Sequence, residues 1–300
     1  MSISDYYQNI ALSYRKVDAF TSGGSLGNPA ACIFVDSNQV LSDAQMQEIA
    51  MQHKGFVSEV VFCKQADSTV DLIYYSSECE VDFCGHGTIA TLYTLFKERS
   101  EFSDREKIVF RTRKKGELVA YNRIFDLDAV LITAPQPAYL SSEWDSDRVC
   151  KALGIEATKL NNTFPIACID AGLKTLIVPI ASFQAEISLN PDEAKLKQFC
   201  FENDVDIVLI FSLDTIQPNA HAHTRVFAPK FGYLEDPATG SGNSAFAYYM
   251  LQYDLWDRRD ILIEQGGYNQ IYNGVRISYC DGSVLFGGSA TIRIFGKYCI

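Results

Sequence analysis

The sequence predicts an α+β protein with two similar halves. Strand-like segments dominate the first third of the chain, and helices are expected between them. With 300 residues and 47% apolar composition, the chain can bury two ordinary hydrophobic cores. A strand, a Gly-x-Gly turn and a helix follow one another twice, once near residue 85 and again near residue 240. These observations favour two domains of related structure.

The first domain is expected to end near residue 122 and to consist of strands with two helices. One helix is predicted over residues 41–55, where Ser42 and Gln45 form a capping box. The other is predicted to begin after the first Gly-x-Gly turn and to run to about Lys97. Strands are predicted at residues 16–20, 30–35, 56–64, 69–76, 106–112 and 116–122.

The second domain, residues 123–300, shows the same mixture of elements. Helices are predicted at residues 145–153 and 190–203, the latter with Asn190 as its N-cap and Pro191 in its first position. Strands are predicted at residues 125–135, 205–213 and 223–229, and a pair of strands is predicted within residues 165–180.

The two Gly-x-Gly turns indicate an internal duplication. The segments CGHG and TGSG begin at Cys84 and Thr239, and each is followed by a helix-like run with Ala and Tyr residues. Three small residues match when the segments are aligned: Gly85 with Gly240, Gly87 with Gly242, and Ala90 with Ala245. The matching context of strand, turn and helix supports the alignment more than the three identities do.

A glycine-rich turn at the start of a helix can serve two purposes. It exposes backbone N–H groups at the positive end of the helix dipole, where they can bind an anion such as a carboxylate. Alternatively, the glycines only permit a tight corner between a strand and a helix. Periodicity alone leaves both interpretations open. Neither turn has the spacing of a P-loop or of a dinucleotide-binding motif.

The composition argues against several kinds of partner. A formal net charge of -11 and a pI near 4.9 disfavour nucleic acid, which is bound through clustered Lys and Arg. The basic stretch at residues 111–115 is too short to change this, and we read it as a solvated strand end. No apolar run approaches the ~20 residues of a membrane span, and the N-terminus lacks a signal-peptide pattern. We therefore expect a cytoplasmic protein without a membrane partner.

The cysteines and histidines predict no metal site. The nine cysteines are scattered without a Cys-x-x-Cys pair, so most are expected to be reduced core residues. Among the histidines, His221 and His223 are the candidates by spacing, and no third ligand lies near them in the sequence. No cofactor is expected.

Five segments of the chain form an ordered set of motifs. They are VDAFTSGGSLGNPAACIFVD, HKGFVSEVVF, VDFCGHGTIAT, RVFAPKFGYLEDPATGS and IEQGGYN. In order and spacing they resemble the motifs of the PhzF-type (phenazine biosynthesis-like) isomerases and, more distantly, those of diaminopimelate epimerase. The resemblance covers about residues 16–296, and its most specific part runs from Asp236 to Ser241.

The resemblance implies a fold and an assembly. The fold has two pseudo-symmetric domains, each a curled, mostly antiparallel sheet around a central helix, with the active site in the cleft between them. It also implies that the last strand, near residues 290–300, returns to the first domain, and that the protein is a homodimer.

The resemblance further implies a set of site residues. The family's acid/base glutamate falls on Glu59, its histidine on His86, and its aspartate and serine on Asp236 and Ser241. Other residues are implied to line the site or to hold the substrate's carboxylate: Asn28, Gly85, Gly87, Thr239, Gly240 and Gly242.

The residues around Glu59 agree with an acid/base role. Burying a charged carboxylate within an apolar strand is costly, so a raised pKa is expected, which suits a group that takes and returns a proton. Alternatively, Glu59 lies on the solvent face of an edge strand. His86 and Asp236 also have ordinary alternatives, as a histidine satisfied within a turn and as a turn residue before Pro237.

The position of cysteine separates two kinds of reaction. Diaminopimelate epimerase uses two thiols, one before each Gly-x-Gly turn. This chain has Cys84 at the first position and Thr239 at the second, and a threonine hydroxyl is no acid or base at neutral pH. Two-thiol epimerisation is therefore disfavoured. Cys84 is read as a small buried residue and is kept as a secondary candidate.

The favoured function is a cofactor-independent isomerisation. Glu59 would remove a proton from an acidic C–H of a small carboxylated substrate and return it elsewhere on the same π system, assisted by His86 and Asp236. Two alternatives are an amino-acid racemase or epimerase, and a carboxylate-binding protein without turnover. Family members usually carry Ala or Pro where this chain has Gly87, and commonly Ala-His at 242–243, so the substrate need not be the dihydro-hydroxyanthranilate that the family's name implies.

Overall fold

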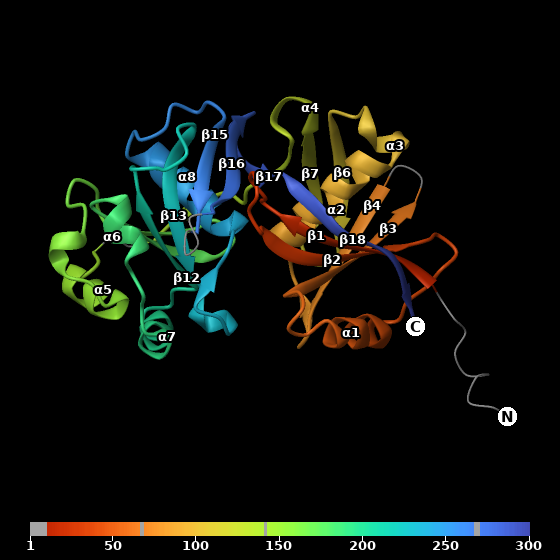
Figure 1. Cartoon of the computed structure of the whole chain (residues 1–300), viewed down its shortest axis with the longest axis horizontal. Coiled ribbons are helices and arrows are strands. Elements are labelled where there is room, and N and C mark those ends of the chain that lie inside the picture. The colour runs from red at the N-terminus through yellow and green to blue at the C-terminus, as the bar shows by residue number, and fades with distance from the viewer. Residues whose placement is uncertain (1–10, 67–68, 141–142, 267–270) are drawn as a thin grey trace. The chain divides into compact units, whose positions relative to one another are not determined.

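A computed structural model describes residues 11–66, 69–140, 143–266 and 271–300 of the chain (Figure 1). The chain divides into two compact units. The first comprises residues 1–21, 26–132 and 289–300, and the second comprises residues 22–25 and 133–288. The boundary expected near residue 122 lies inside a strand, and the first unit continues past it because the following strand pairs with that one.

The first unit is a mixed sheet with helices on both faces. Its strands are β1 (Ala11–Ala19), β2 (Asn28–Val35), β3 (Glu59–Ala66), β4 (Thr69–Ser76), β5 (Glu80–Val81), β6 (Lys107–Thr112), β7 (Gly116–Arg123), β8 (Ala129–Thr133) and β18 (Ala290–Cys299). Its helices are α1 (Asp43–Gln52), α2 (Gly85–Glu98), α3 (Ser100–Ser103) and α4 (Ile124–Leu127).

The strand order of the first unit is β18-β1-β2-β3-β4-β6-β7-β8, and β5 pairs with the end of β4. The pairs β2–β3 and β4–β6 are parallel, and the other pairs are antiparallel. The last strand of the chain therefore lies beside the first, as the blue and red ribbons show (Figure 1).

Helix α1 covers one face of this sheet. The predicted capping box is confirmed, because the side chains of Ser42 and Gln45 each accept from the other residue's backbone N–H. The helix ends at Gln52, short of the predicted residue 55. Its buried side chains, among them Met46 and Ile49, pack against alternate strand residues such as Ile33.

Helix α2 covers the opposite face and contacts β1, β2, β3 and β18. Every residue from Gly87 to Phe96 is buried. The three threonines in this run are satisfied inside the core because the hydroxyls of Thr88, Thr91 and Thr94 each donate to the carbonyl four residues earlier. A helix buried on all sides fits the central helix that the family resemblance implied.

The second unit has the same construction. Its strands are β9 (Ala138–Tyr139), β10 (Ala167–Asp170), β11 (Lys174–Pro179), β12 (Ile207–Ser212), β13 (Ala220–Phe227), β14 (Glu235–Asp236), β15 (Ile261–Gln265), β16 (Asn273–Cys280) and β17 (Ser283–Gly288). Its helices are α5 (Ser146–Leu153), η2 (Ala157–Lys159), α6 (Phe183–Ile187), α7 (Glu193–Glu202), η3 (Pro229–Phe231) and α8 (Gly240–Gln252).

The strand order of the second unit repeats that of the first. It runs β9-β10-β11-β12-β13-β15-β16-β17, with β14 against the end of β13. The parallel pairs, β11–β12 and β13–β15, occupy the places of β2–β3 and β4–β6. The predicted α+β class with two pseudo-symmetric units is thereby confirmed.

Helix α8 is the counterpart of α2, whereas α5 and α7 pack on the other face of their sheet. Rings of Phe246 and Tyr249 meet Phe211 of β12 on the α8 side. The prediction of Asn190 as the N-cap of α7, with Pro191 in its first position, is wrong because the helix begins at Glu193. Asp192 caps this helix, because its carboxylate accepts from the backbone N–H of Lys195 at 2.9 Å.

At Gly240, helix α8 packs closely against β17 of its sheet. A Cβ at this position would lie 2.3 Å from Cε2 of Phe286, whose side chain is fully buried. We predict that Gly240→Ala lowers the free energy of unfolding by about 1 to 3 kcal/mol through overpacking. Chemical denaturation measures the change. Gly296→Ala is the control, because a Cβ there meets nothing within 4 Å. Equal stability of the two variants would contradict the packing argument.

Candidate active site

Glu59 is the first residue of β3, between Ala30 of β2 and Ser76 of β4. The strand begins here and not at the predicted residue 56. Val61, two residues on, faces α2, since a Cβ on Gly87 would lie 2.6 Å from its Cγ2. Alternate residues of a strand share a face, so Glu59 also points to the α2 side. Its side chain is 21% exposed.

His86 lies in the first turn of α2, beside both Glu59 and Cys84. Its Nε2 is 3.2 Å from Oε2 of Glu59, and its Nδ1 is 3.4 Å from Sγ of Cys84. Cys84 is the N-cap of α2, and its sulfur accepts from the backbone N–H of Gly87 at 3.3 Å. The Ser58 hydroxyl also lies 3.3 Å from Nε2. Strand β3 and the start of α2 thus bring a carboxylate, an imidazole and a thiol together.

The charges of these groups are set by one another. Burial raises the pKa of Glu59, but the nearby His86 imidazole and the Ser58 hydroxyl outweigh burial, and the pKa falls below its ordinary value. Burial lowers the pKa of His86, but Cys84 and Glu59 raise it well above its ordinary value. Burial raises the pKa of the Cys84 thiol. The Glu59 carboxylate and the His86 imidazolium therefore favour each other's charged form, and burial favours the neutral Cys84 thiol.

The expected raised pKa of Glu59 is wrong for this structure. Burial acts in the expected direction, but the sequence could not reveal that His86 stands 3.2 Å from the carboxylate. Glu59 Oε2 is buried, and no described residue makes a hydrogen bond to it. Its contact with His86 is therefore an ion pair without hydrogen-bond geometry. Oε2 can still accept a proton or a hydrogen bond.

The second unit has a turn before α8 that is held by the side chain of Gln265 from β15. Asp236 is buried at the end of β14, and its Oδ2 accepts from the Thr239 hydroxyl at 2.5 Å. The backbone N–H of Thr239 donates to Oε1 of Gln265 at 3.0 Å, and Nε2 of Gln265 donates to the Asp236 carbonyl at 3.0 Å. These contacts fix the corner from which α8 starts.

Gln265 and Asn243 are structural residues of this corner that the sequence analysis did not single out. Both are fully buried, and Nδ2 of Asn243 donates to Oε1 of Gln265 at 2.7 Å. The available signal was Gln265 itself, which stands in the segment IEQGGYN. The last three residues of that segment, 267–269, lie outside the described residues.

The remaining predicted site residues lie at the starts of the two central helices or beside them. Gly85 and Gly87 are in the first turn of α2, and Gly240, Ser241 and Gly242 are in the first turn of α8. Asn28 is buried at the first position of β2. The first N–H groups of a helix have no acceptor within it, so both starts can bind an anion. The roles of these residues stay predictions.

The strand register aligns the two units residue by residue, and the aligned positions differ in chemistry. Each functional candidate is equivalent in this alignment to a residue of another kind: Glu59 to Ile207, Asp236 to Val81, Cys84 to Thr239, and His86 to Ser241. The duplication has therefore preserved the backbone and not the chemical groups. A pair of equivalent bases, one from each unit, is absent from these aligned positions.

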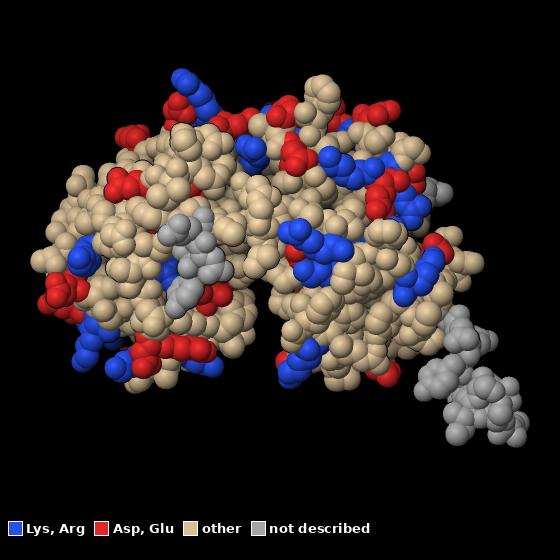
Figure 2. Space-filling model, viewed as in Figure 1, with Lys and Arg blue, Asp and Glu red and all other residues tan. Residues whose placement is uncertain are grey.

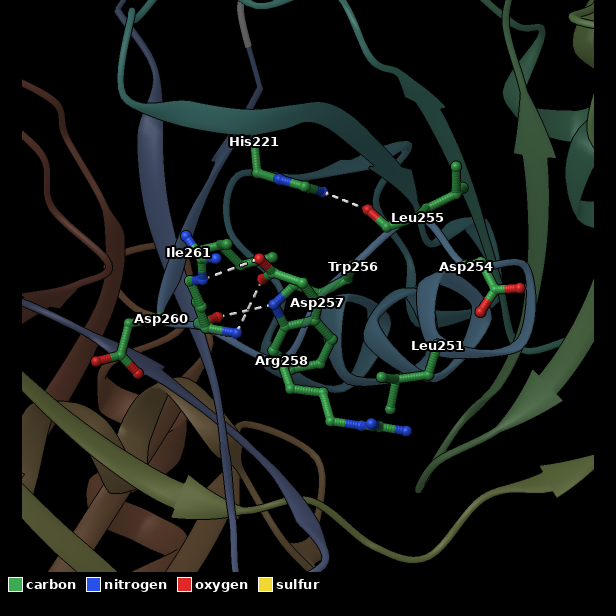
Figure 3. A pocket seen from close by; sticks show the side chains of 10 residues that line it. His221, Leu251, Asp254, Leu255, Trp256, Asp257, Arg258, Asp260 and Ile261 are labelled. Atoms are coloured by element: carbon green, nitrogen blue, oxygen red, sulfur yellow. Dashed lines mark hydrogen bonds and ion pairs between the residues drawn. The ribbon is translucent and has the colours of Figure 1, made fainter.

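A separate hollow of about 720 Å³ lies in the second unit (Figure 3). Charged side chains such as Asp254 and Arg258 line it, and none of the predicted site residues does. Its His221 points at the carbonyl of Leu255, 2.8 Å from Nε2. His223, the other histidine candidate for a metal ligand, is buried between Glu186 and the Gly266 carbonyl.

The mixed surface charges and the burial of most cysteines agree with what the sequence predicted. Lys and Arg lie among Asp and Glu on the face shown in Figure 2. Six of the nine cysteines are buried and none forms a disulfide, as the sequence predicted for most of them. No helix within the described residues is both long and apolar enough to cross a bilayer.

A family model for phenazine biosynthesis-like proteins matches residues 17–284. The chain belongs to this family. It is 30% identical over 256 residues to the uncharacterized isomerase YfhB of Bacillus subtilis, covering 84% of this chain and 85% of the relative. It is 27% identical over 247 residues to trans-2,3-dihydro-3-hydroxyanthranilate isomerase of Pseudomonas aeruginosa, covering 80% of each.

A solved structure shares the fold of this phenazine biosynthesis-like protein. The PhzF-family protein of Bacillus anthracis superposes with a TM-score of 0.83 at 22% identity, covering 97% of this chain and 100% of the other. The family that the motifs suggested is thus confirmed.

The ion pair leads to a prediction for the titration of His86. NMR of the imidazole nitrogens should show a pKa well above 6.5 in the wild-type protein. Glu59→Gln removes a negative charge 3.2 Å away and should lower that pKa by about one unit or more. An unchanged titration in the variant would contradict the ion pair.

The free energy of unfolding should depend on pH through the same ion pair, with opposite signs for Glu59 and His86. A raised folded-state pKa means that the contribution of His86 is complete below its unfolded pKa and is lost as the pH rises through the folded pKa. The lowered pKa of Glu59 means that its contribution is present above its unfolded pKa and is lost as the pH falls through the folded pKa. The pair therefore stabilises the fold most between the unfolded pKa of Glu59 and the unfolded pKa of His86.

Gln265 should be essential for the corner before α8. Gln265→Leu leaves the Thr239 N–H and the Asn243 amide without their acceptor, and we expect the free energy of unfolding to fall by about 2 to 4 kcal/mol. Urea denaturation measures it. Gln198→Leu, on the exposed side of α7, is the matched control and should change stability little. A comparable loss in both variants would refute the special role of Gln265.

Proposed function

We propose that this protein is a cofactor-independent isomerase of small carboxylated substrates, with Glu59 as general acid and base. One observation carries the proposal. Glu59 is a carboxylate at neutral pH, largely buried, with an imidazolium 3.2 Å away and an oxygen that accepts no hydrogen bond from the described residues. A base in this state can receive a proton without first losing one.

The proton transfer balances within the substrate. Glu59 removes a proton from a C–H bond next to the substrate's π system, and the electron pair of that bond spreads over the π system and its carboxylate. The resulting Glu59 carboxylic acid then returns the proton to another carbon, which regenerates the carboxylate and shifts the double bond. The His86 imidazolium favours this sequence because a positive charge stabilises the transient anion.

The substrate's carboxylate is assigned to the start of α2. The N–H of Gly87 already donates to the Cys84 sulfur, which leaves the amides of Gly85 and His86 as the donors that we assign to it. Asp236, Ser241 and the first turn of α8 enter the proposal through the family motif. The named activity of the Pseudomonas aeruginosa relative, isomerisation of trans-2,3-dihydro-3-hydroxyanthranilate, supports a carboxylated substrate.

A racemase or epimerase is the second candidate, favoured by the place of Cys84. The thiol stands 3.4 Å from His86 at the start of α2, where it could act as a second base. The raised pKa of the thiol weakens this alternative, because burial keeps it protonated. Solvent deuterium that appears at a stereocentre with inversion would favour the racemase. A migrated double bond would favour the isomerase.

The proposal is tested by proton exchange in deuterated water. Wild-type protein is incubated with a panel of small cyclic and amino carboxylates, and NMR follows deuterium incorporation at each carbon. Glu59→Gln should slow exchange by about 10² to 10⁴-fold, the usual contribution of a general base. The wild-type rate should level off above the pKa of Glu59, which lies below that of an ordinary glutamate.

The matched control is Glu117→Gln, which removes an exposed carboxylate from another strand and should leave exchange unchanged. Equal exchange in wild type and Glu59→Gln would move the base elsewhere, with Cys84 and Asp236 as the next candidates. A panel that binds without any exchange would favour a carboxylate-binding protein.

A further inference from the structure

Three side chains of the first unit form a cluster with the chemistry of a metal site. They are Cys84, His86 and Glu59, and one ligand atom from each lies within 4.8 Å of the other two. His86 Nε2 is 3.8 Å from Sγ of Cys84 and 3.2 Å from Oε2 of Glu59. Tetrahedral zinc with ordinary Zn–S, Zn–N and Zn–O bonds separates its ligand atoms by about 3.3 to 3.6 Å. The two His86 separations lie close to these values, and the Glu59 and Cys84 ligand atoms are less than 4.8 Å apart.

We propose that Cys84, His86 and Glu59 bind one thiophilic divalent cation, such as Zn²⁺, Co²⁺ or Cd²⁺. The three residues supply one sulfur, one nitrogen and one oxygen atom, which leaves the fourth tetrahedral position to a water molecule or an anion. A thiolate with an imidazole selects these cations over Mg²⁺ and Ca²⁺, which prefer oxygen ligands.

The backbone holds the three ligands where a cation needs them. Cys84 and His86 belong to the N-cap and first turn of α2, and Glu59 opens β3, so none depends on a long loop. The Gly87 N–H donates to the Cys84 sulfur at 3.3 Å, and with the positive end of the helix dipole it would support the thiolate that forms when a cation displaces the thiol proton. His86 would likewise release its Nε2 proton to the solvent when it binds the cation. Oε2 of Glu59 makes no hydrogen bond with a described residue, so a metal would not have to displace one.

The sequence could not reveal this cluster. A Cys-x-His pair is too short to be a metal motif, and the third ligand lies on a strand that precedes it. The expectation of no metal site rested on His221 and His223, which have no third ligand near them in the sequence. The geometry points to a different histidine.

Cation binding would regulate the proposed isomerase. A cation on Oε2 occupies the electron pair with which Glu59 accepts the substrate's proton, so zinc should inhibit turnover. This consequence rests on the proposed function. The binding itself does not, and it can be measured without a substrate.

The test is a titration of the purified full-length protein with Co²⁺ under reducing, chelator-free conditions. Cobalt bound to a thiolate gives a charge-transfer absorption in the near ultraviolet. We expect this band to saturate at one equivalent in wild type and to vanish when excess Zn²⁺ is added. Cys84→Ser should abolish it while keeping an N-cap side chain for α2. Glu59→Gln and His86→Gln should weaken cobalt affinity at least tenfold, since each removes one ligand.

Cys79→Ser and Cys299→Ser are the matched controls, because both thiols are exposed and could bind cobalt nonspecifically. Both variants should keep the band. A band that survives Cys84→Ser would overturn the proposal, as would unchanged affinity in both Glu59→Gln and His86→Gln, or no band in wild type. Circular dichroism verifies that each variant is folded, and the near-isosteric Glu59→Gln remains decisive if Cys84→Ser does not fold.

The outcome is separable from that of the proposed function. Normal proton exchange in Glu59→Gln together with lost cobalt affinity would refute the acid/base role and leave the cation site standing. If Glu59→Gln lost proton exchange and the wild type showed no cobalt band, the cation site would be refuted and the acid/base role would stand.

Discussion

The constraint on which each unit depends is the burial of one helix against one face of its sheet. Helix α2 has no polar side left for solvent, and α8 is nearly as deeply buried, so each must start and end at positions fixed by the strands. The glycines make this possible. Gly87 lies against Val61, and Gly240 lies against Phe286, at separations that a methyl group could not share. Because strand residues alternate in direction, the position of α2 also decides that Glu59 faces the start of the helix.

That arrangement sets the electrostatics of the first unit. Two helix-terminal residues and one strand residue meet where the helix dipole is positive, and burial alone would neutralise the carboxylate and the imidazole. The ion pair reverses both tendencies, so Glu59 stays charged and His86 is protonated. The second unit uses the same backbone to place Asp236 under a threonine hydroxyl and a buried glutamine. A duplicated fold thus carries two different chemical groups, which suits one acid/base residue better than a symmetric pair of bases.

The sequence could predict what depends on local chemistry. The capping box at Ser42, the start of each central helix at its Gly-x-Gly turn and most strands follow from neighbouring residues, and the structure has them. Asp192 caps the helix in place of Asn190 because two capping residues two positions apart compete, and the sequence does not rank them. The sign of the pKa shift at Glu59, the role of Gln265 and the cluster with Cys84 depend on residues brought together by the sheet. No spacing in the chain encodes those distances.

The same packing explains why a glycine stands at position 87. A Cβ at this position would lie 2.6 Å from Cγ2 of Val61 and 3.0 Å from the Cys84 sulfur. The valine and the thiol occupy the space that a side chain would need. Gly87, Val61 and Cys84 therefore form one coupled set, in which the glycine makes room for the sulfur beside His86. A larger residue at position 87 would displace the valine or the thiol, and a displaced thiol would change its contact with His86.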